Sequence, residues 1–541
     1  MLDRLYGVAD ALTLLHGWRR GLTAFASGAM CVLAMPPVFF APILLLTLPV
    51  LVLLLDGADV DPRPNGRWAR LRPSSFFWVG FWFGYGYFLA GLYWIAEALL
   101  VNPAAHGWLI LPALIFIPGG LALFFALPCA LARRFWASGS RRVLLLAALL
   151  VVFEWLRGWL FTGFPWNGFH SAFGLHEALL QGFALVGPLV ASLLVLLVAM
   201  LPAALWPRGS GLRGFLVYAL SCLVLIGGWT GYGALRLSNA TDAVQEAITF
   251  RLVQPNIAQA DKWDPALRDQ HMATLFDLSQ RNTGPDQAGL LSVTHLVWPE
   301  SAFPFLVAER PDVLVALGEM LPLGTHLIAG AVRSEPRARD RVFYNSVYAF
   351  NDRGEIADAY DKVRLVPFGE RLPFSDLVDR LGLGPLVSAP AGFEAGPGPG
   401  VLSSPGAPDG LALVCYEAIF PAFVRAGVRQ HRPGYLLNVT NDAWFGASAG
   451  PHQHVFQARL RAVEMGLPMV RAANTGVSAI IDGYGRYWAR LELGEQGVLD
   501  AQLPAALPVT VFARLGNWPC LLLLVLILTW SVYYHRTHGR V

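Results

Sequence analysis

Long apolar stretches dominate the first part of the chain, and one more lies near its end. Such stretches are typical of membrane helices, which need roughly 20 residues to cross the hydrocarbon layer. They cover residues 21–37, 39–55, 74–99, 108–132, 143–163, 177–205, 214–231 and 518–534. The first ends at Pro36-Pro37 and is short for a span, so a tilted or kinked helix is expected there. The pattern predicts a multi-span α-helical membrane bundle of about eight helices.

From about Ile248 the pattern changes to short β-rich runs that alternate with helical stretches, which predicts a layered α/β domain. Predicted strands cover 248–253, 295–298, 327–332, 346–350, 411–414, 435–439 and 477–481, and predicted helices 265–281, 311–320, 420–430 and 452–466. The Pro/Gly-rich stretch 389–408 is expected to be a long surface loop near the site. The expected division is a membrane domain at 1–234, an α/β domain at 235–515, and a last membrane helix with its tail at 516–541.

Composition supports a membrane protein and argues against one class of partner. Of the 541 residues, 55% are hydrophobic, and the mean hydropathy of +0.49 is high for a soluble enzyme. The formal net charge is only +3, and no basic stripe interleaved with aromatic residues is visible. A nucleic-acid partner is therefore not expected.

The arginines predict an orientation, because positive charge in short loops resists translocation. They gather at five places that an eight-span topology puts on one side: Arg19 and Arg20; Arg63, Arg67, Arg70 and Arg72; Arg133, Arg134, Arg141 and Arg142; Arg208 and Arg213; Arg536 and Arg540. The intervening loops 101–107 and 163–176 carry no lysine or arginine. Both termini are thus expected in the cytoplasm, and residues 235–515 outside it.

Cys415 is the one cysteine of the predicted α/β domain. The other four, Cys31, Cys129, Cys222 and Cys520, lie in or beside predicted spans. A structural cysteine in an oxidising compartment would be expected to have a disulfide partner, and none is near. Cys415 also follows the predicted strand 411–414, and loops at strand ends often carry reactive groups. These features predict a reactive thiol.

Glu300 and Lys362 also follow or interrupt apolar runs, so an α/β domain could bring them to Cys415. A buried carboxylate can take a thiol proton, and an ammonium can stabilise the oxyanion formed by thiolate attack on a carbonyl. The chain has only two lysines, Lys262 and Lys362, against dozens of arginines, which suggests a need for a compact charge at Lys362. Taken singly, Cys415 would be interpreted as a small buried hydrophobe, Glu300 as a charged loop residue and Lys362 as a surface cation.

Three segments, Trp298-Pro299-Glu300-Ser301, Tyr360-Asp361-Lys362 and Cys415-Tyr416-Glu417, resemble the Glu-Lys-Cys segments of the nitrilase (carbon-nitrogen hydrolase) superfamily. Combined with the membrane bundle and the last apolar helix, they resemble the apolipoprotein N-acyltransferase family of bacterial inner membranes. Further similar stretches are 253–256, 365–370, 438–446, 451–454 and 471–476. Their common order along almost the whole chain makes the resemblance specific.

The resemblance implies an extracytoplasmic αββα sandwich in the periplasm. It implies transfer of an acyl chain from a phospholipid to the α-amine of a diacylglyceryl-cysteine in an apolipoprotein, in a ping-pong cycle with a Cys415 thioester. Glu300 would be the general base, Cys415 the nucleophile and Lys362 the oxyanion group. Glu370 and Glu417 would position the lysine and the thiol, while Tyr416, Trp263, Asn345 and Trp444 fall at substrate or oxyanion positions. It implies no metal or organic cofactor, and a monomer is expected.

Two features of the membrane part leave alternatives open. Glu154 and Arg157 lie three residues apart on one predicted helix and could neutralise each other, the favoured interpretation, or Arg157 could offer its charge to a lipid phosphate. The aromatic loop 162–170 fits an interfacial belt or an entry for acyl chains.

Two rival functions fit parts of the pattern. A membrane-anchored amidase or nitrilase would use the same residues with water as acceptor. A transporter with an appended binding domain would be expected to show repeated halves or paired interrupted helices, which the sequence lacks. His452 and His454 could suggest a metal, but capping or packing roles are expected for them, and turn roles for Asn441 and Asp442.

Overall fold

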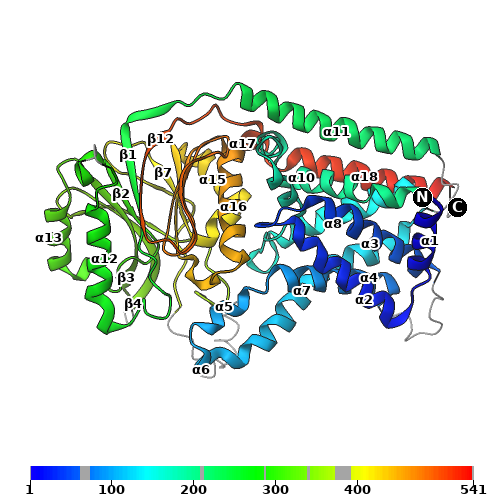
Figure 1. Cartoon of the computed structure of the whole chain (residues 1–541), viewed down its shortest axis with the longest axis horizontal. Coiled ribbons are helices and arrows are strands. Elements are labelled where there is room, and N and C mark those ends of the chain that lie inside the picture. Colours follow the sequence, from blue (N-terminus) through cyan, green and yellow to red (C-terminus); the bar gives the residue numbers. More distant parts are fainter. Residues whose placement is uncertain are drawn as a thin grey trace. The chain divides into compact units, whose positions relative to one another are not determined.

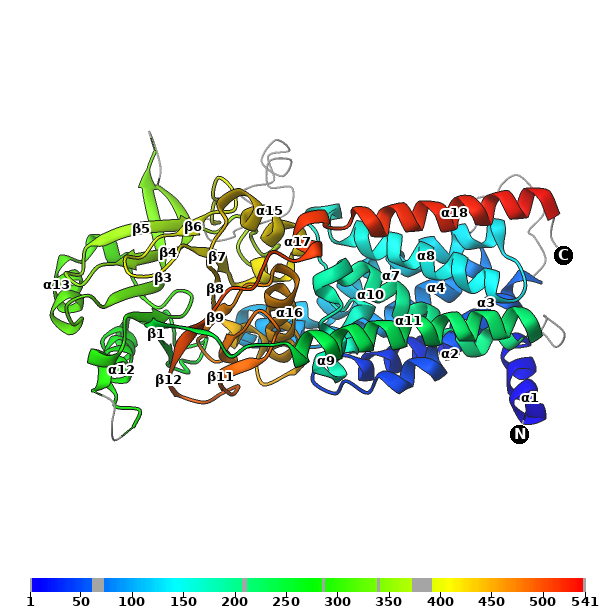
Figure 2. The same cartoon turned by 90° about the horizontal axis from the view of Figure 1, so that it is seen from above.

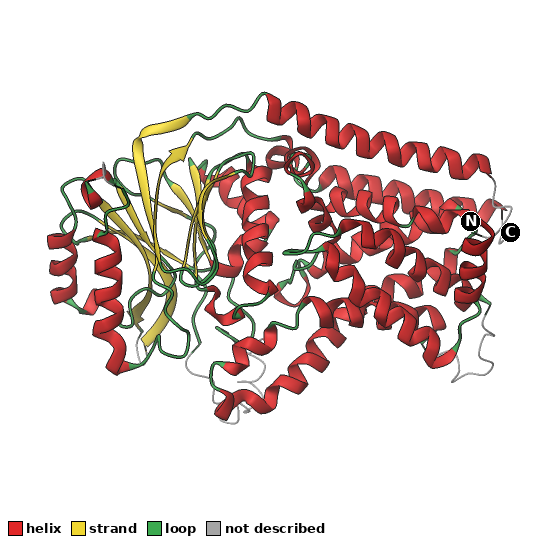
Figure 3. Cartoon of the chain, viewed as in Figure 1, coloured by secondary structure: helices red, strands yellow, loops and turns green. Residues whose placement is uncertain are grey.

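The computed structural model describes residues 2–60, 73–206, 212–284, 288–337, 341–371 and 392–538. The chain forms two compact units: a helical unit of Met1–Asn239 with Leu515–Val541, and an α/β unit of Ala240–Arg514. Figure 3 shows the strands gathered in the second of these. Some sequence features lie outside the described residues, namely Arg63, Arg67, Arg70, Arg72, Arg208, Arg540 and residues 389–391 of the Pro/Gly-rich stretch.

Each of the eight predicted apolar stretches contains a helix. The helices of the helical unit are α1 (Leu2–Thr13), α2 (Gly17–Cys31), α3 (Leu44–Asp59), α4 (Ser75–Gly91), α5 (Ile95–Leu100), α6 (Pro103–His106), α7 (Ile110–Ala132), α8 (Ser140–Arg157), α9 (Glu177–Leu180), α10 (Phe183–Ala199), α11 (Leu212–Ser238) and α18 (Trp518–His538). Small residues let α2 and α4 approach closely, because a Cβ at Gly28 or Gly86 would collide with the facing backbone at Phe83 or Phe25.

Four helical segments of the described chain are long and apolar enough to cross a membrane: Ala41–Asp59, Pro103–Phe135, Arg213–Ser238 and Trp518–Thr537. The sequence predicted about eight spans. The difference has a physical reason, since α2, α4 and α10 have only 15 to 17 residues and α8 carries four charged residues. The structure therefore supports a membrane-associated helical unit with four candidate spans.

Arginines near several helix ends gather at one end of the helical unit. Arg20 donates to the carbonyls of Leu15 and Gly57. Arg142 donates to Ala203 and Trp206 and pairs with Asp56 at 3.1 Å. A contact of 3.3 Å joins Arg134 to His535 near the end of α18. Figure 1 marks both chain termini at this same end.

The α/β unit contains two six-stranded sheets, with strand orders β12-β1-β2-β3-β4-β5 and β11-β10-β9-β8-β7-β6. The strands are β1 (Val244–Gln254), β2 (His295–Trp298), β3 (His326–Pro336), β4 (Arg341–Phe350), β5 (Ile356–Asp361), β6 (Val401–Leu402), β7 (Gly410–Val414), β8 (Tyr435–Thr440), β9 (Met469–Ala473), β10 (Ser478–Ile481), β11 (Tyr487–Leu491) and β12 (Gly497–Pro504). Strands β1–β3 run parallel, as do β7–β9. The seven predicted strands are present, whereas β5, β6, β9, β11 and β12 were not predicted.

Helices cover the outer faces of both sheets, which makes four layers (Figure 1, Figure 2). They are α12 (Arg268–Gln280) and α13 (Pro311–Met320) on the first sheet, and α15 (Pro421–His431) and α16 (Ala449–Met465) on the second; a short α17 (Val511–Leu515) follows. Leu275 of α12 and Leu317 of α13 pack in one core with Trp298. Between the sheets the rings of Phe250 and Tyr435 lie 5.4 Å apart. The α/β unit is thus an αββα sandwich.

Candidate active site

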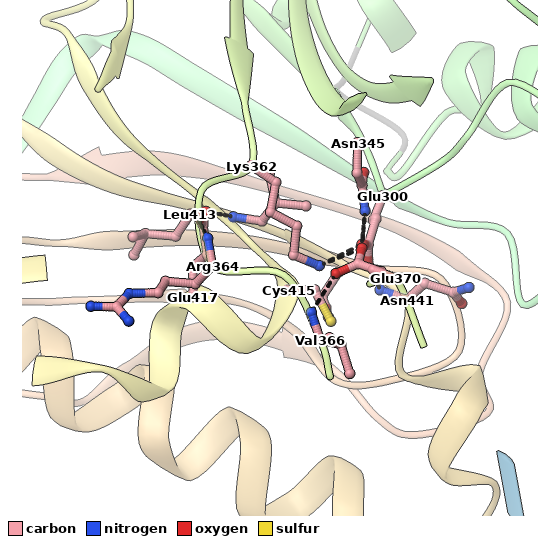
Figure 4. A network of polar contacts seen from close by, with 12 residues as sticks. Glu300, Asn345, Lys362, Arg364, Val366, Glu370, Leu413, Cys415, Glu417 and Asn441 are labelled. Carbon is pink, nitrogen blue, oxygen red and sulfur yellow. Dashed lines mark hydrogen bonds and ion pairs between the residues drawn. The ribbon is translucent and has the colours of Figure 1, made fainter. Parts of the chain in front are cut away.

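Three strand ends bring Glu300, Lys362 and Cys415 together (Figure 4). Glu300 lies two residues after β2, Lys362 directly follows β5, and Cys415 directly follows β7. Lys362 Nζ lies 3.4 Å from Glu300 Oε1, and the charges of both groups act on the Cys415 thiol. All three side chains are buried. A sheet-based scaffold therefore holds a nucleophile, a carboxylate and an ammonium in one enclosed place.

The backbone at two of these positions is unusual. Cys415 has φ +47° and Ser301, the neighbour of Glu300, has φ +50°. Non-glycine residues rarely adopt this left-handed conformation, and it persists where surrounding contacts enforce it, often at functional sites. Gly330 of β3 makes room for the turn at Glu300, since a Cβ there would lie 2.5 Å from the Glu300 Cα.

Lys362 is held between two carboxylates. Its Nζ donates to Glu370 Oε1 at 2.8 Å as well as to Glu300. Burial opposes the ammonium charge, but the carboxylates of Glu370 and Glu300 outweigh it and raise the pKa of Lys362 above its usual range. Lys362 is therefore a permanent cation in the site.

Glu300 accepts hydrogen bonds from three groups. Asn345 Nδ2 and Lys362 reach Oε1, at 2.7 and 3.4 Å, and the main-chain N–H of Asn441 reaches Oε2 at 2.8 Å. Asn345 also donates to Glu370 at 2.7 Å, so its amide bridges two carboxylates. The structure thus places Asn345, which the sequence put at a substrate or oxyanion position, in contact with the Glu300–Lys362–Glu370 network.

The thiol needs a base. Burial is the largest cause that raises the pKa of Cys415 to about 12, and the Glu300 charge adds to it. At neutral pH the side chain is a thiol rather than the thiolate that attacks carbonyl carbons. A carboxylate beside it can take the proton as the sulfur attacks.

Glu417 joins the strand ends. It accepts from the main-chain N–H groups of Val363, Arg364 and Val414 at 2.7, 3.0 and 2.8 Å, and from the Tyr360 hydroxyl. Burial raises the pKa of Glu417 to about 7 in spite of these donors. The side chain thereby links the segment that carries Lys362 to the segment that carries Cys415.

A second buried hydrogen-bond network contacts the main chain of Cys415. His454 Nε2 lies 3.1 Å from the Cys415 carbonyl oxygen and Nδ1 lies 2.7 Å from Asp442 Oδ1, while Arg471 donates to Asp442 Oδ2 at 2.7 Å. Sequence reasoning gave His454 a capping or packing role and Asn441 and Asp442 turn roles. It missed the contact of Asn441 with Glu300 and that of His454 with Cys415, since spacing along the chain carries no signal for them.

Cys415, Asp442 and His454 offer potential metal-ligand atoms within 4.8 Å of one another. The two ring nitrogens of His454 and both oxygens of Asp442 already have protein partners, however, and the Arg471 guanidinium supplies a cation at Asp442. The cluster fits a hydrogen-bonded support for the Cys415 backbone.

Asp442 makes a testable contribution to acid stability. Burial opposes its ionisation, but Arg471 and His454 lower the pKa of Asp442 to about 2 from 3.8. Stability from a lowered carboxyl pKa is present above pH 4 and lost as the pH falls toward 2. Between pH 5 and pH 2 the free energy of unfolding should fall by about 2 kcal/mol more in the wild type than in Asp442→Asn. Equal slopes in denaturant titrations of the two proteins would contradict this.

The remaining predicted site residues are spread more widely. Tyr416 is buried, with its ring edge-on to Phe420 at 5.0 Å. The side chains of Trp263 and Trp444 are 45% and 42% exposed on the α/β unit, so they are open to a ligand.

Arg157 belongs to the helical unit and is buried there. It donates to the carbonyls of Phe164 and Trp166, whereas Glu154 accepts from Ser192 at 2.7 Å and lies 3.3 Å from His170 Nδ1. The charges of Glu154 and Arg157 also act on each other, which fits the favoured interpretation that they neutralise each other, and each side chain has further hydrogen-bond partners in the helical unit.

The four-layer fold with its cysteine, lysine and glutamate defines a carbon-nitrogen hydrolase domain, and the family model with the description "Carbon-nitrogen hydrolase" matches residues 297–508. A second model, "Apolipoprotein N-acyltransferase N-terminal domain", matches residues 27–201. The chain belongs to the apolipoprotein N-acyltransferase family.

Similar proteins of that name support this assignment over nearly the full length. The protein of Rhodopseudomonas palustris is 42% identical over 535 residues, 98% of each chain. That of Bradyrhizobium diazoefficiens is 43% identical over 527 residues, 97% of this chain and 96% of the relative. Among solved structures, an amidase from Nesterenkonia sp. matches 49% of this chain and 93% of its own, at 20% identity and a TM-score of 0.35.

Proposed function

We propose that the protein transfers an acyl chain from a phospholipid to the α-amine of the diacylglyceryl-cysteine of an apolipoprotein, through a thioester on Cys415. The observation that carries the proposal is the buried cluster of Glu300, Lys362 and Cys415 in a chain of this family. The cluster contains a nucleophile, a base and an oxyanion group, and the apolar helices of the chain fit a membrane, which would hold the phospholipid donor.

In the first half of the cycle Glu300 takes the thiol proton while Cys415 attacks the ester carbonyl of the phospholipid. The oxyanion is stabilised by the Lys362 ammonium and the Tyr416 main-chain N–H. The bond from the carbonyl carbon to the glycerol oxygen then breaks, and protonated Glu300 gives its proton to that oxygen. A lysophospholipid leaves, and the acyl chain remains on sulfur.

In the second half the lipoprotein amine attacks the thioester carbonyl. Glu300 takes a proton from the amine, the carbon–sulfur bond breaks, and an amide forms. Protonated Glu300 then returns the proton to the Cys415 sulfur, which restores the starting enzyme. Glu370 and Glu417 keep the lysine and the thiol in place through the hydrogen bonds described above. Trp263 and Trp444, which are exposed, are proposed to contact substrate. The cycle uses no metal or organic cofactor.

The same proposal includes a location. We place the α/β unit in the periplasm and both termini in the cytoplasm of a bacterial inner-membrane protein with about eight spans, acting as a monomer. The support is the arginine-bearing end of the helical unit and the positive-inside rule. Arg157 donates to the carbonyls of Phe164 and Trp166 through one guanidinium nitrogen. Its other guanidinium N–H groups are proposed to contact a lipid phosphate.

An acyl-transfer assay tests the function. A phospholipid donor and a diacylglyceryl-cysteine peptide are expected to give an N-acylated peptide with wild type and with Cys222→Ala, a cysteine of α11, and none with Cys415→Ala. Release of free fatty acid or ammonia without an acylated peptide would favour a hydrolase, and transport activity independent of Cys415 would favour a transporter.

A further inference from the structure

Both lysines of the chain lie at the same glutamate. Lys362 reaches the Glu300 carboxylate, and Lys262 Nζ donates to the Glu300 main-chain oxygen at 2.9 Å. Lys262 is 5% exposed. The other cationic side chains of this chain are arginines. The presence of both lysines at one residue therefore indicates that both ammonium groups serve the site around Glu300.

The turn that carries Lys262 is docked on the site by a second contact. Gln259 Oε1 accepts from Asn441 Nδ2 at 2.6 Å, and the main-chain N–H of the same Asn441 holds the Glu300 carboxylate. Lys262 is therefore placed by residues that also place Glu300.

The two ammonium groups differ in their partners. Lys362 has two carboxylates, whereas within the described part of the chain the Glu300 carbonyl is the one hydrogen-bond acceptor of Lys262 Nζ. An ammonium has three N–H groups, so two remain for other acceptors. Burial lowers the pKa of Lys262 to about 8, while the charges of Glu300 and Cys415 raise it, which places this ammonium within electrostatic reach of the nucleophile.

The charge balance shows what Lys262 adds. Glu300 and Glu370 both pair with Lys362, so these three groups together carry one negative charge, and the Glu300 charge opposes ionisation of Cys415. Asp442 is already paired with Arg471, and Glu417, if ionised, adds further negative charge. Three further titratable groups lie near Lys262, namely Asp261 and Asp264 beside it in the sequence and His271 of α12. Burial lowers the pKa of His271, which favours its neutral form. Lys262 thus adds one positive charge within electrostatic reach of Glu300 and Cys415.

We propose that Lys262 is a second cationic group of the active site, whose charge stabilises the negative charge that forms on Cys415 sulfur and on the acyl carbonyl oxygen. This role rests on the proposed thioester chemistry. It differs from that of Lys362, because the hydrogen bond of Lys262 Nζ goes to a carbonyl oxygen rather than to a carboxylate, so its other N–H groups can turn toward new negative charge.

The test measures Cys415 in Lys262→Met, Lys262→Arg and, as a control, Arg281→Met, which removes an exposed cation after α12. Two rates are followed: alkylation by iodoacetamide, and single-turnover acylation by a phospholipid or by a p-nitrophenyl fatty-acid ester that has no phosphate. Lys262→Met should slow alkylation about tenfold and acylation by both donors about a hundredfold. Lys262→Arg should recover part of the alkylation rate, and Arg281→Met should match wild type.

Unchanged rates in Lys262→Met would overturn the proposal. A loss confined to the phospholipid donor would also overturn it, because Lys262 would then bind the phosphate. If wild type forms no acyl-enzyme, the proposed function fails, while the alkylation rates still decide the role of Lys262. Lys262→Gln replaces the Met variant if that variant does not fold.

Discussion

Replacing Glu300 with glutamine is expected to slow acylation of Cys415 by about a thousandfold or more, within the range of general-base effects. With a pKa of about 12, only a very small fraction of Cys415 is thiolate at neutral pH, so attack depends on proton removal by the carboxylate. Both oxygens of Glu300 accept hydrogen bonds, so the amide NH₂ group of the glutamine would face a hydrogen-bond donor where the wild type has an acceptor. Single-turnover formation of the acyl-enzyme measures the effect.

The matched control for that substitution is Glu309→Gln, which changes an exposed carboxylate of the same unit that pairs with Arg341. It should leave acylation unchanged. Acylation of Glu300→Gln within tenfold of wild type, in folded protein, would show that another group removes the thiol proton.

Replacing Lys362 with methionine is expected to affect both activity and stability. Two buried carboxylates, Glu300 and Glu370, would be left facing each other without a cation. Loss of one member of a buried ion pair typically costs about 3–5 kcal/mol, and loss of an oxyanion donor costs about a hundredfold to a thousandfold in rate. Urea unfolding and acyl-enzyme formation measure the two effects.

A double variant separates these contributions. Lys362→Met with Glu370→Gln removes one negative charge as well, so it should recover part of the lost stability but none of the lost rate. Recovery of acylation in the double variant, or wild-type stability in the single one, would contradict the role assigned to Lys362.

The sequence predicted the strands before Glu300 and Cys415 better than the elements at the sheet edges, which include β5, the strand before Lys362. Strand β2 and helix α13 have the predicted bounds, since both are clearly delimited apolar runs. Strands β5, β11 and β12 were missed because edge strands are partly solvated and carry polar residues such as Asp358 and Arg490. Strand β9 was missed although it is fully buried, because Arg471 interrupts its apolar pattern and is neutralised only by Asp442 from elsewhere in the fold.

The site shows the same limit. Motifs led to Glu300, Lys362 and Cys415, which the structure brings together. The main-chain N–H of Asn441, the bridging amide of Asn345 and the contact of His454 with the Cys415 carbonyl depend on tertiary geometry. Lys262 was visible as one of two lysines, but only the folded chain places its ammonium at Glu300. Counting a rare residue type was the one signal that pointed toward it.

The most direct test of the account is the intact mass of the protein after incubation with phospholipid and no acceptor. Wild type should gain the mass of one acyl chain, which hydroxylamine removes because thioesters are cleaved by this nucleophile, and Cys415→Ala should gain nothing. An acylated Cys415→Ala protein, or a wild type that acylates the peptide without ever carrying an acyl group, would contradict a thioester on Cys415.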